Sequence, residues 1–112
     1  MMHLAEVRTQ WRGDTPVGAI LGEVDAASAA AVAAALRDLV TNRMTGLVVD
    51  LTETRYLDSA GINLLFTLGD ELRARQLSLK LVVPPASPIA RMLRISSLDT
   101  LYPTFATLDE AL

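Results

Sequence analysis

The sequence of 112 residues contains no cysteine, which excludes a disulfide framework, a thiolate metal site and a cysteine nucleophile. Basic residues are also few, with 10 Lys and Arg against 13 Asp and Glu, and they form no run. Binding to a nucleic-acid backbone or to an acidic membrane surface needs a basic footprint, so we expect neither kind of partner. No apolar run approaches the ~18 residues that span a bilayer, and we therefore expect no membrane segment.

Motifs that would indicate an enzyme are missing as well. The chain has no glycine-rich phosphate loop, no dinucleotide-binding fingerprint and no nucleophile elbow. Its single histidine, His3, lies near the start of the chain, and we interpret it as a solvated terminal residue rather than a catalytic group or metal ligand. We therefore expect no catalytic residue, no metal and no cofactor. A free-standing enzyme is the function class that the sequence supports least.

The residues that are present predict one folded domain. Hydrophobic residues make up 51% of the chain, and a chain of this length is typical of a single domain with its own core. We therefore assign residues 1–112 to one domain. The first six residues lack a positive region followed by an apolar stretch, so we expect no signal peptide and a cytoplasmic protein.

A hairpin is predicted at the start of the domain. Polar and apolar residues alternate over residues 4–11, which is the period of a half-exposed strand. Arg12-Gly13-Asp14 is a turn signal, and residues 16–24 form the second strand, with Pro16 at a position that an edge or a strand start tolerates. Further strands are expected at residues 46–51, at 78–83 and, briefly, at 101–102.

Helical patterns lie between the predicted strands. The first follows Asp25, which can act as its N-cap, and eight of residues 26–35 are alanine, the best helix former. The second runs from the Asp58–Gly61 segment to about Gln76. A short third helix follows Ser87-Pro88 and reaches Leu98, and a last helical turn begins at Thr107. The order β-β-α-β-α-β-α-(β)-α predicts a single α/β domain with a mixed, mostly parallel sheet and four helices.

One loop combines residues that could carry a function. Asp58 and Ser59 lie between a buried strand and the second helix, at the edge of the sheet where α/β proteins usually bind ligands and partners. The simplest interpretation is that one of them caps the helix, which contributes about 1 kcal/mol. A compatible hypothesis is that Ser59 is phosphorylated, because free N–H groups at a helix start can hold a phosphate and the added charge of about −1.5 to −2 would repel a partner.

Three neighbours of Ser59 fit either interpretation. Gly61 has no side chain, so a second protein or a nucleotide could approach the backbone closely. Ile62 and Phe66 lie one turn apart, beside the inner stripe of the second helix. They fill the edge of the core or form the apolar part of a docking face, and the sequence leaves both possibilities open.

Several segments of the chain together resemble the pattern of a known family. The segments Gly46-Leu47-Val48-Val49-Asp50-Leu51 and Tyr56-Leu57-Asp58-Ser59-Ala60-Gly61-Ile62 resemble the signature of the STAS domain, and most closely that of bacterial anti-sigma factor antagonists. Residues 21–25, 79–84, 95–98 and 107–112 agree with the same pattern. The resemblance covers nearly the whole chain. The Asp-Ser-x-Gly motif resembles that of the STAS domains that are phosphorylated on this serine.

The resemblance implies a STAS-like fold and a partner switch. In that family the unmodified antagonist binds an anti-sigma factor that is also a serine kinase with a histidine-kinase-like ATPase fold, which frees a sigma factor. The kinase phosphorylates the antagonist, and a PP2C-type phosphatase resets it. Ser59 carries over as the phosphorylated serine, Asp58 and Gly61 as flanking residues and Asp25 as an acidic neighbour. The expected partner-binding residues are Asp25, Asp58, Ser59, Ala60, Gly61, Ile62 and Phe66.

Some positions depart from the family pattern. Ala60 stands where a second hydroxyl residue often follows the phosphoserine, which leaves one acceptor rather than two. Asn63 replaces a common glycine, and Ser96-Ser97-Leu98 replaces a frequent Thr-Gly-Leu, so the geometry of that turn is open.

Other functions remain open alternatives. The chain could be a scaffolding STAS subunit of a stress-sensing or transporter-associated complex, or a small module that binds purine nucleotides. The lack of a phosphate loop disfavours nucleotide binding. We expect a monomer or a weak homodimer, because the opening strands could leave an exposed edge.

Overall fold

The computed structural model describes residues 5–41 and 44–112. His3, and Leu4 at the start of the first expected strand, lie outside the described residues. Within the described ranges the strands are β1 (Glu6–Arg12), β2 (Thr15–Val24), β3 (Gly46–Asp50), β4 (Thr54–Leu57), β5 (Ser78–Val82) and β6 (Thr104–Phe105). The helices there are α1 (Ala29–Arg37), α2 (Ser59–Ala74), α3 (Ala90–Ile95), α4 (Leu98–Leu101) and α5 (Leu108–Ala111).

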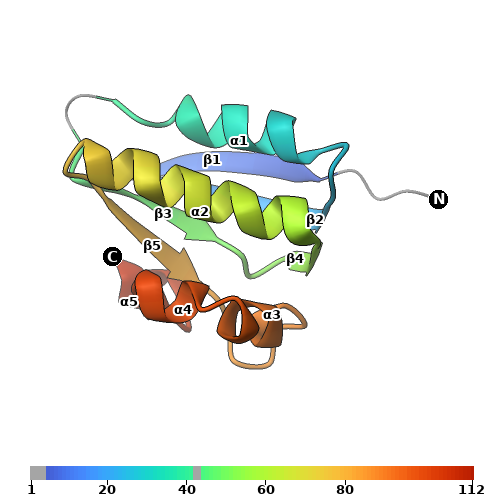
Figure 1. Cartoon of the computed structure of the whole chain (residues 1–112). Coiled ribbons are helices and arrows are strands. Elements are labelled where there is room, and N and C mark those ends of the chain that lie inside the picture. Colours follow the sequence, from blue (N-terminus) through green and yellow to red (C-terminus); the bar gives the residue numbers. More distant parts are fainter. Residues whose placement is uncertain (1–4, 42–43) are drawn as a thin grey trace.

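The strands form one mixed sheet in the order β1-β2-β3-β5-β6 (Figure 1). Strands β1 and β2 form the antiparallel hairpin, and the other pairings are parallel. Strand β2 is long enough to pair with β3 along its first half and with β4 at its end, where Val24 lies opposite Leu57. The prediction of a single α/β domain with a mostly parallel sheet is confirmed.

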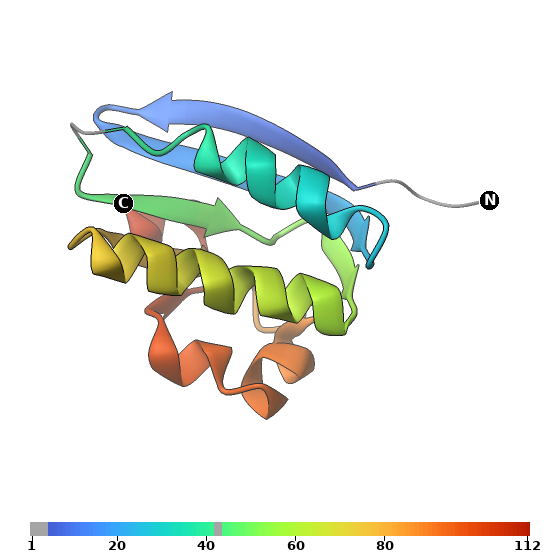
Figure 2. The ribbon, with the colours of Figure 1, turned by 45° about the horizontal axis from the view of Figure 1, so that its top comes forward.

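The main core lies between the sheet and helices α1 and α2, which run side by side over one face (Figures 1 and 2). Alternation along the buried strands divides their side chains between the two faces. Leu47 and Val49 of β3 point into the main core, whereas Val48 belongs to a smaller cluster under α5 on the opposite face. Across the described residues, no helix combines the length and the apolar character that a bilayer crossing requires.

Strand β4 lies where the sequence suggested a loop. Its four residues are too short for a clear alternating pattern, and the strand is defined by its neighbour. The hydroxyl of Thr54 is buried and donates to the carbonyl of Ile20 at 2.6 Å, and the following residues pair with the end of β2. The extra strand therefore depends on a long-range contact, which local sequence does not encode.

The start of the first helix also differs from the expectation. Helix α1 begins at Ala29 with Ser28 as its N-cap, not at Asp25. Asp25 instead closes a preceding turn, because its carboxylate accepts the N–H of Ser28 at 3.0 Å and its own N–H donates to the Ser28 hydroxyl at 3.0 Å. Ser28 makes no side-chain cap hydrogen bond to the helix, so the side chain that caps this segment is that of Asp25, one turn before the helix begins.

The expected third helix is divided into α3 and α4. Ser97 lies between them in the left-handed region with φ of 65°, which a helix cannot continue through. The position where the family pattern has glycine therefore keeps the glycine-like conformation, although a serine occupies it. Leu101 ends α4 and Tyr102 follows it as the C-cap, so the last strand begins at Thr104 rather than at Leu101.

Candidate functional site

The start of α2 is fixed by Asp58, whose backbone is extended with φ of −84° and ψ of −170°. Its Oδ1 atom accepts the N–H groups of Ala60 at 2.8 Å and of Gly61 at 3.1 Å. The N-cap interpretation is confirmed for Asp58. Ser59 is the first residue of the helix and is exposed, so its hydroxyl is accessible on a rigid backbone.

Asp25 lies at the neighbouring strand end. The N–H of Asp58 donates to the carbonyl of Val24 at 3.1 Å, so the backbones that carry the two aspartates run next to each other. The side chain of Asp25 is half-buried and is bonded to Ser28. The end of β2 and the start of α2 therefore form an acidic corner, where a further negative charge would be repelled.

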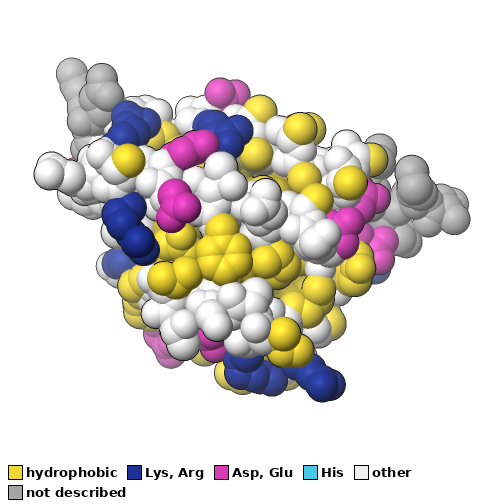
Figure 3. Space-filling model, viewed as in Figure 1, with side chains coloured by type: hydrophobic (Ala, Val, Ile, Leu, Met, Phe, Trp, Pro, Cys, Tyr) yellow, Lys and Arg dark blue, Asp and Glu magenta, His cyan; other side chains and the backbone are white. Residues whose placement is uncertain are grey.

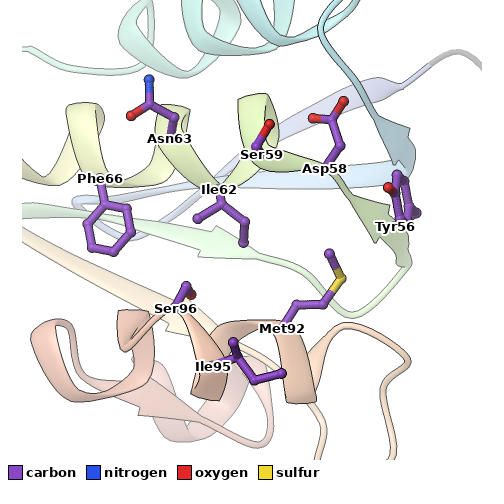
Figure 4. Close-up of a pocket in the computed structure, with 9 residues that line it drawn as sticks. All are labelled: Tyr56, Asp58, Ser59, Ile62, Asn63, Phe66, Met92, Ile95 and Ser96. Carbon is purple, nitrogen blue, oxygen red and sulfur yellow. The ribbon is translucent and has the colours of Figure 1, made fainter.

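Ser59 and Asp58 border an open groove of about 530 Å³. One wall is α2, the facing wall is α3, and the end of β4 closes one side (Figure 4). The lining residues are Tyr56, Asp58, Ser59, Ile62, Asn63, Phe66, Met92, Ile95 and Ser96. We call this feature the α2–α3 groove.

The floor and walls of the α2–α3 groove are mostly apolar. Ile62, Phe66 and Met92 are half-buried and pack on the main core with one side while they face the groove with the other. Ile95 is 73% exposed and Tyr56 is 46% exposed. Figure 3 shows a band of hydrophobic side chains between α2 and the α3–α4 segment. A continuous apolar surface of this kind is typical of a site that binds a partner or a ligand.

Tyr102 holds the second wall of the groove in place. It follows α4, is buried, and its hydroxyl donates to the carbonyl of Phe66 at 3.4 Å. The ring lies directly over Gly69 of α2, where a Cβ atom would overlap it, and the guanidinium carbon of Arg73 lies 5.9 Å from the ring centre. Burial, followed by the charge of Asp70, raises the pKa of the Tyr102 hydroxyl. This contact connects the α3–α4 segment to α2.

The structure brings together four of the predicted site residues and separates three. Asp58, Ser59, Ile62 and Phe66 all line the groove. Ile62 and Phe66 fill the edge of the core, as one interpretation held, and they also face the groove. That they dock a partner stays a prediction. Asp25, Ala60 and Gly61 lie beside the groove, outside its lining.

The reasoning for Gly61 needs a correction. The residue is buried, and a Cβ atom there would lie 3.1 Å from Leu57 Cδ2 and 3.3 Å from Val24 Cβ. The close approach that glycine allows is that of α2 onto strands β2 and β4. It does not open the surface to a second protein or a nucleotide.

Sequence reasoning missed the half of the site that comes from distant segments. Tyr56, Met92, Ile95 and Ser96 line the groove, although the sequence predicts no site role for any of them. A large apolar residue on the outer face of a short helix is the signal that could have identified Ile95. Among the described residues, no cluster of three or more His, Cys, Asp or Glu is placed to hold a metal ion.

The chain is similar to proteins of one family. Residues 7–103 match a family model described as "Mlab, STAS domain". The anti-sigma-F factor antagonist RsfB of Mycobacterium tuberculosis is 33% identical over 92 residues, which cover 81% of this chain and 73% of that protein.

Solved structures share the fold at lower identity. An anti-sigma factor antagonist from Mycobacterium paratuberculosis has a TM-score of 0.79 at 24% identity and covers 96% of this chain and 90% of its own. The antagonist SpoIIAA in its unphosphorylated form has a TM-score of 0.75 at 20% identity, with 95% and 92% covered. The phosphorylated form of Bacillus SpoIIAA has a TM-score of 0.68 at 21% identity, with 95% and 96% covered.

Proposed function

Because this chain belongs to the STAS domain family, we propose that it is an anti-sigma factor antagonist whose partner binding is controlled by phosphorylation of Ser59. The unmodified protein binds an anti-sigma factor that is also a serine kinase and thereby releases a sigma factor. The observation that carries the proposal is the exposed hydroxyl of Ser59 at the border of the apolar α2–α3 groove.

The apolar residues supply the attraction for the partner. Ile62, Phe66 and Met92 are already fixed against the core, so a partner that covers them gains apolar burial without ordering them first. Ile95 adds a largely exposed side chain at the facing wall. Asp58 and Ser59 form the polar border of the same surface, which matches the usual arrangement of an apolar centre with a polar rim.

A phosphate on Ser59 would remove this attraction. Asp58 already accepts the N–H groups of Ala60 and Gly61, so these donors are not free to hold a phosphate as the sequence suggested. The phosphate would remain at the surface and add about −1.5 to −2 charge beside the Asp58 carboxylate. A partner would then have to desolvate and cover a group that repels acidic neighbours.

The modification itself is an ordinary phosphoryl transfer. The Oγ atom of Ser59 forms a bond to the γ-phosphorus of ATP, the bond from that phosphorus to the β-phosphate oxygen breaks, and ADP leaves. The hydroxyl proton passes to a base of the kinase. A PP2C-type phosphatase reverses the state by hydrolysis, with water as the nucleophile and inorganic phosphate as the product.

The test uses two substitutions to aspartate on the same helix. Ser59→Asp introduces a charge at the groove border, whereas Thr67→Asp introduces the same charge at an exposed residue outside the groove lining. We expect the anti-sigma factor kinase to bind the wild type and Thr67→Asp and to lose affinity for Ser59→Asp. Asp is favourable in the first turn of a helix, so a loss of binding would not reflect unfolding.

Incubation with that kinase and ATP tests the acceptor directly. Mass spectrometry of the wild type should locate the phosphate on Ser59, and Ser59→Ala should bind the kinase but remain unmodified. Modification at a different residue would contradict the assignment. Stable association with a larger complex without any ATP-dependent modification would instead support the scaffolding alternative.

A further inference from the structure

The outer edge of β1 is a long strand edge whose protection consists of three charged side chains, Glu6, Arg8 and Arg12. Strand β1 lies at the end of the sheet order, and within the described chain only β2 pairs with it. All seven of its residues pair with β2 in one continuous register, without a bulge. It contains no proline and no lysine, the residues that often block such edges. The edge is therefore available for pairing with another strand.

The hairpin turn determines which backbone groups face outward. Gly13 and Asp14 form a two-residue turn, and Gly13 has φ of 63°, as a type II′ turn requires. Arg12 and Thr15, which flank this turn, are therefore a hydrogen-bonded pair. Because such pairs alternate along an antiparallel ladder, the outward N–H and C=O groups of β1 belong to Val7, Thr9 and Trp11.

We propose that β1 pairs with β1 of a second copy of this chain, antiparallel and about a two-fold axis at Thr9. This register places each Thr9 opposite the other and each Val7 opposite the partner copy's tryptophan at position 11. On the other face of the strand, Glu6 lies opposite Arg12, and Arg8 lies opposite Gln10. The outward groups of all three residues then find partners, and the only charged pair directly opposite one another is an attractive one.

The neighbouring registers lack this complementarity. Each side chain stays on the same face of the sheet only when the pairing shifts by an even number of residues. Moving the two-fold axis to Arg8 places that arginine against its own copy, and moving it to Gln10 places Arg8 against Arg12. Like charges directly opposite each other are destabilising. Registers displaced further shorten the overlap, so the axis at Thr9 is the one that the sequence of β1 favours.

The competing intramolecular contacts are weak. Glu6 lies 2.7 Å from Arg8, and Arg12 lies 3.5 Å from Asp109, but all four side chains are at the surface. Strand β1 also lies on the opposite side of the molecule from α3 (Figure 2), so pairing leaves both α2–α3 grooves open. The product is a weak dimer that presents two partner-binding sites.

Sedimentation equilibrium of the full chain up to about 1 mM, the range of weak association, tests the dimer. Glu6→Lys and Arg12→Glu each turn an attractive pair into a repulsive one, twice per dimer by symmetry, so each should weaken dimerisation about tenfold. The combined variant restores opposite charges and should return to within about twofold of the wild type. Arg8→Gln is the matched control, since Arg8 faces a neutral residue and its loss should have little effect.

Two further readouts keep the register falsifiable. Trp11 is the single tryptophan and is 49% exposed, so its emission should shift to the blue as the concentration rises. The chain has no cysteine, so a single introduced cysteine can form a disulfide only between two copies. Thr9→Cys should form this disulfide on mild oxidation faster than Gln10→Cys, because the register places position 9 opposite itself and position 10 opposite position 8. A monomer throughout the concentration range would overturn the proposal. A dimer in which Arg8→Gln strengthens association, or in which the combined variant gains nothing over the single ones, would overturn the register.

Discussion

Substitution of Gly69 by alanine should destabilise the protein, although alanine is the better helix former. The three atoms nearest to an added Cβ all belong to Tyr102, and they include ring carbons, so moving the hydroxyl end alone does not make room. The ring must leave part of its buried position and its hydrogen bond to Phe66. A buried aromatic side chain covers about 150–250 Å², which corresponds to roughly 4–6 kcal/mol when it is exposed completely.

Only part of that energy should be lost in the Gly69→Ala variant. Overpacking typically costs about 1–3 kcal/mol, and replacing a helical glycine by alanine returns about 1 kcal/mol. We therefore expect a net loss of up to about 2 kcal/mol in the free energy of unfolding, measured by urea denaturation. The control is the same substitution in a Tyr102→Ala background, where the obstacle is absent and alanine should stabilise by about 1 kcal/mol.

The test is whether Gly69→Ala lowers the free energy of unfolding when Tyr102 is present and raises it in the Tyr102→Ala background. If Gly69→Ala stabilised the protein with Tyr102 present as much as without it, the ring would not hold the α3–α4 segment against α2. The second wall of the groove would then lack the support that the contact provides.

Three further predictions concern the left-handed turn residues, the N-cap of α2 and the ionisation of Tyr102. Ser97→Gly and Gln76→Gly should each stabilise the fold by up to about 1 kcal/mol in urea denaturation, because both residues have left-handed φ angles of 65° and 61°; a loss of stability would contradict this strain. Asp58→Ala should cost about 1 kcal/mol by removing the N-cap, whereas Asp58→Asn should keep most of the stability, since an amide oxygen can accept the same N–H groups. The pKa of Tyr102 is raised in the folded state, so folding favours the neutral hydroxyl. The stability that this adds to the fold is complete below the unfolded pKa of about 10, and it is lost as the pH rises from there through the folded pKa. Tyr102→Phe should flatten the fall in thermal stability above that pH, and an unchanged slope would refute the assignment.

The elements with strong local patterns were predictable from the sequence. The hairpin at Gly13, the alanine-rich helix and the buried strand at Gly46–Asp50 follow from turn chemistry, helix propensity and continuous branched residues. The cap at Asp58 followed from residue type and position. These features depend on interactions within a few residues, which a local pattern contains.

The remaining features depend on contacts between distant segments. Strand β4 exists because Thr54 reaches Ile20 and the following residues pair with β2. The groove exists because Tyr102 holds α3 and α4 beside α2. The sequence identified the wall that carries Ser59 but not the facing wall with Ile95, since nothing near that residue indicates which surface it will face.

The affinity of the anti-sigma factor kinase for the protein with and without phosphate on Ser59 tests the central claim most directly. Titration calorimetry with both forms, each checked for an intact fold by circular dichroism, gives the two dissociation constants. We predict a loss of about 100-fold or more on phosphorylation, which is roughly 2.7 kcal/mol. Equal affinity for the two forms would show that the Ser59 hydroxyl does not control binding at the α2–α3 groove.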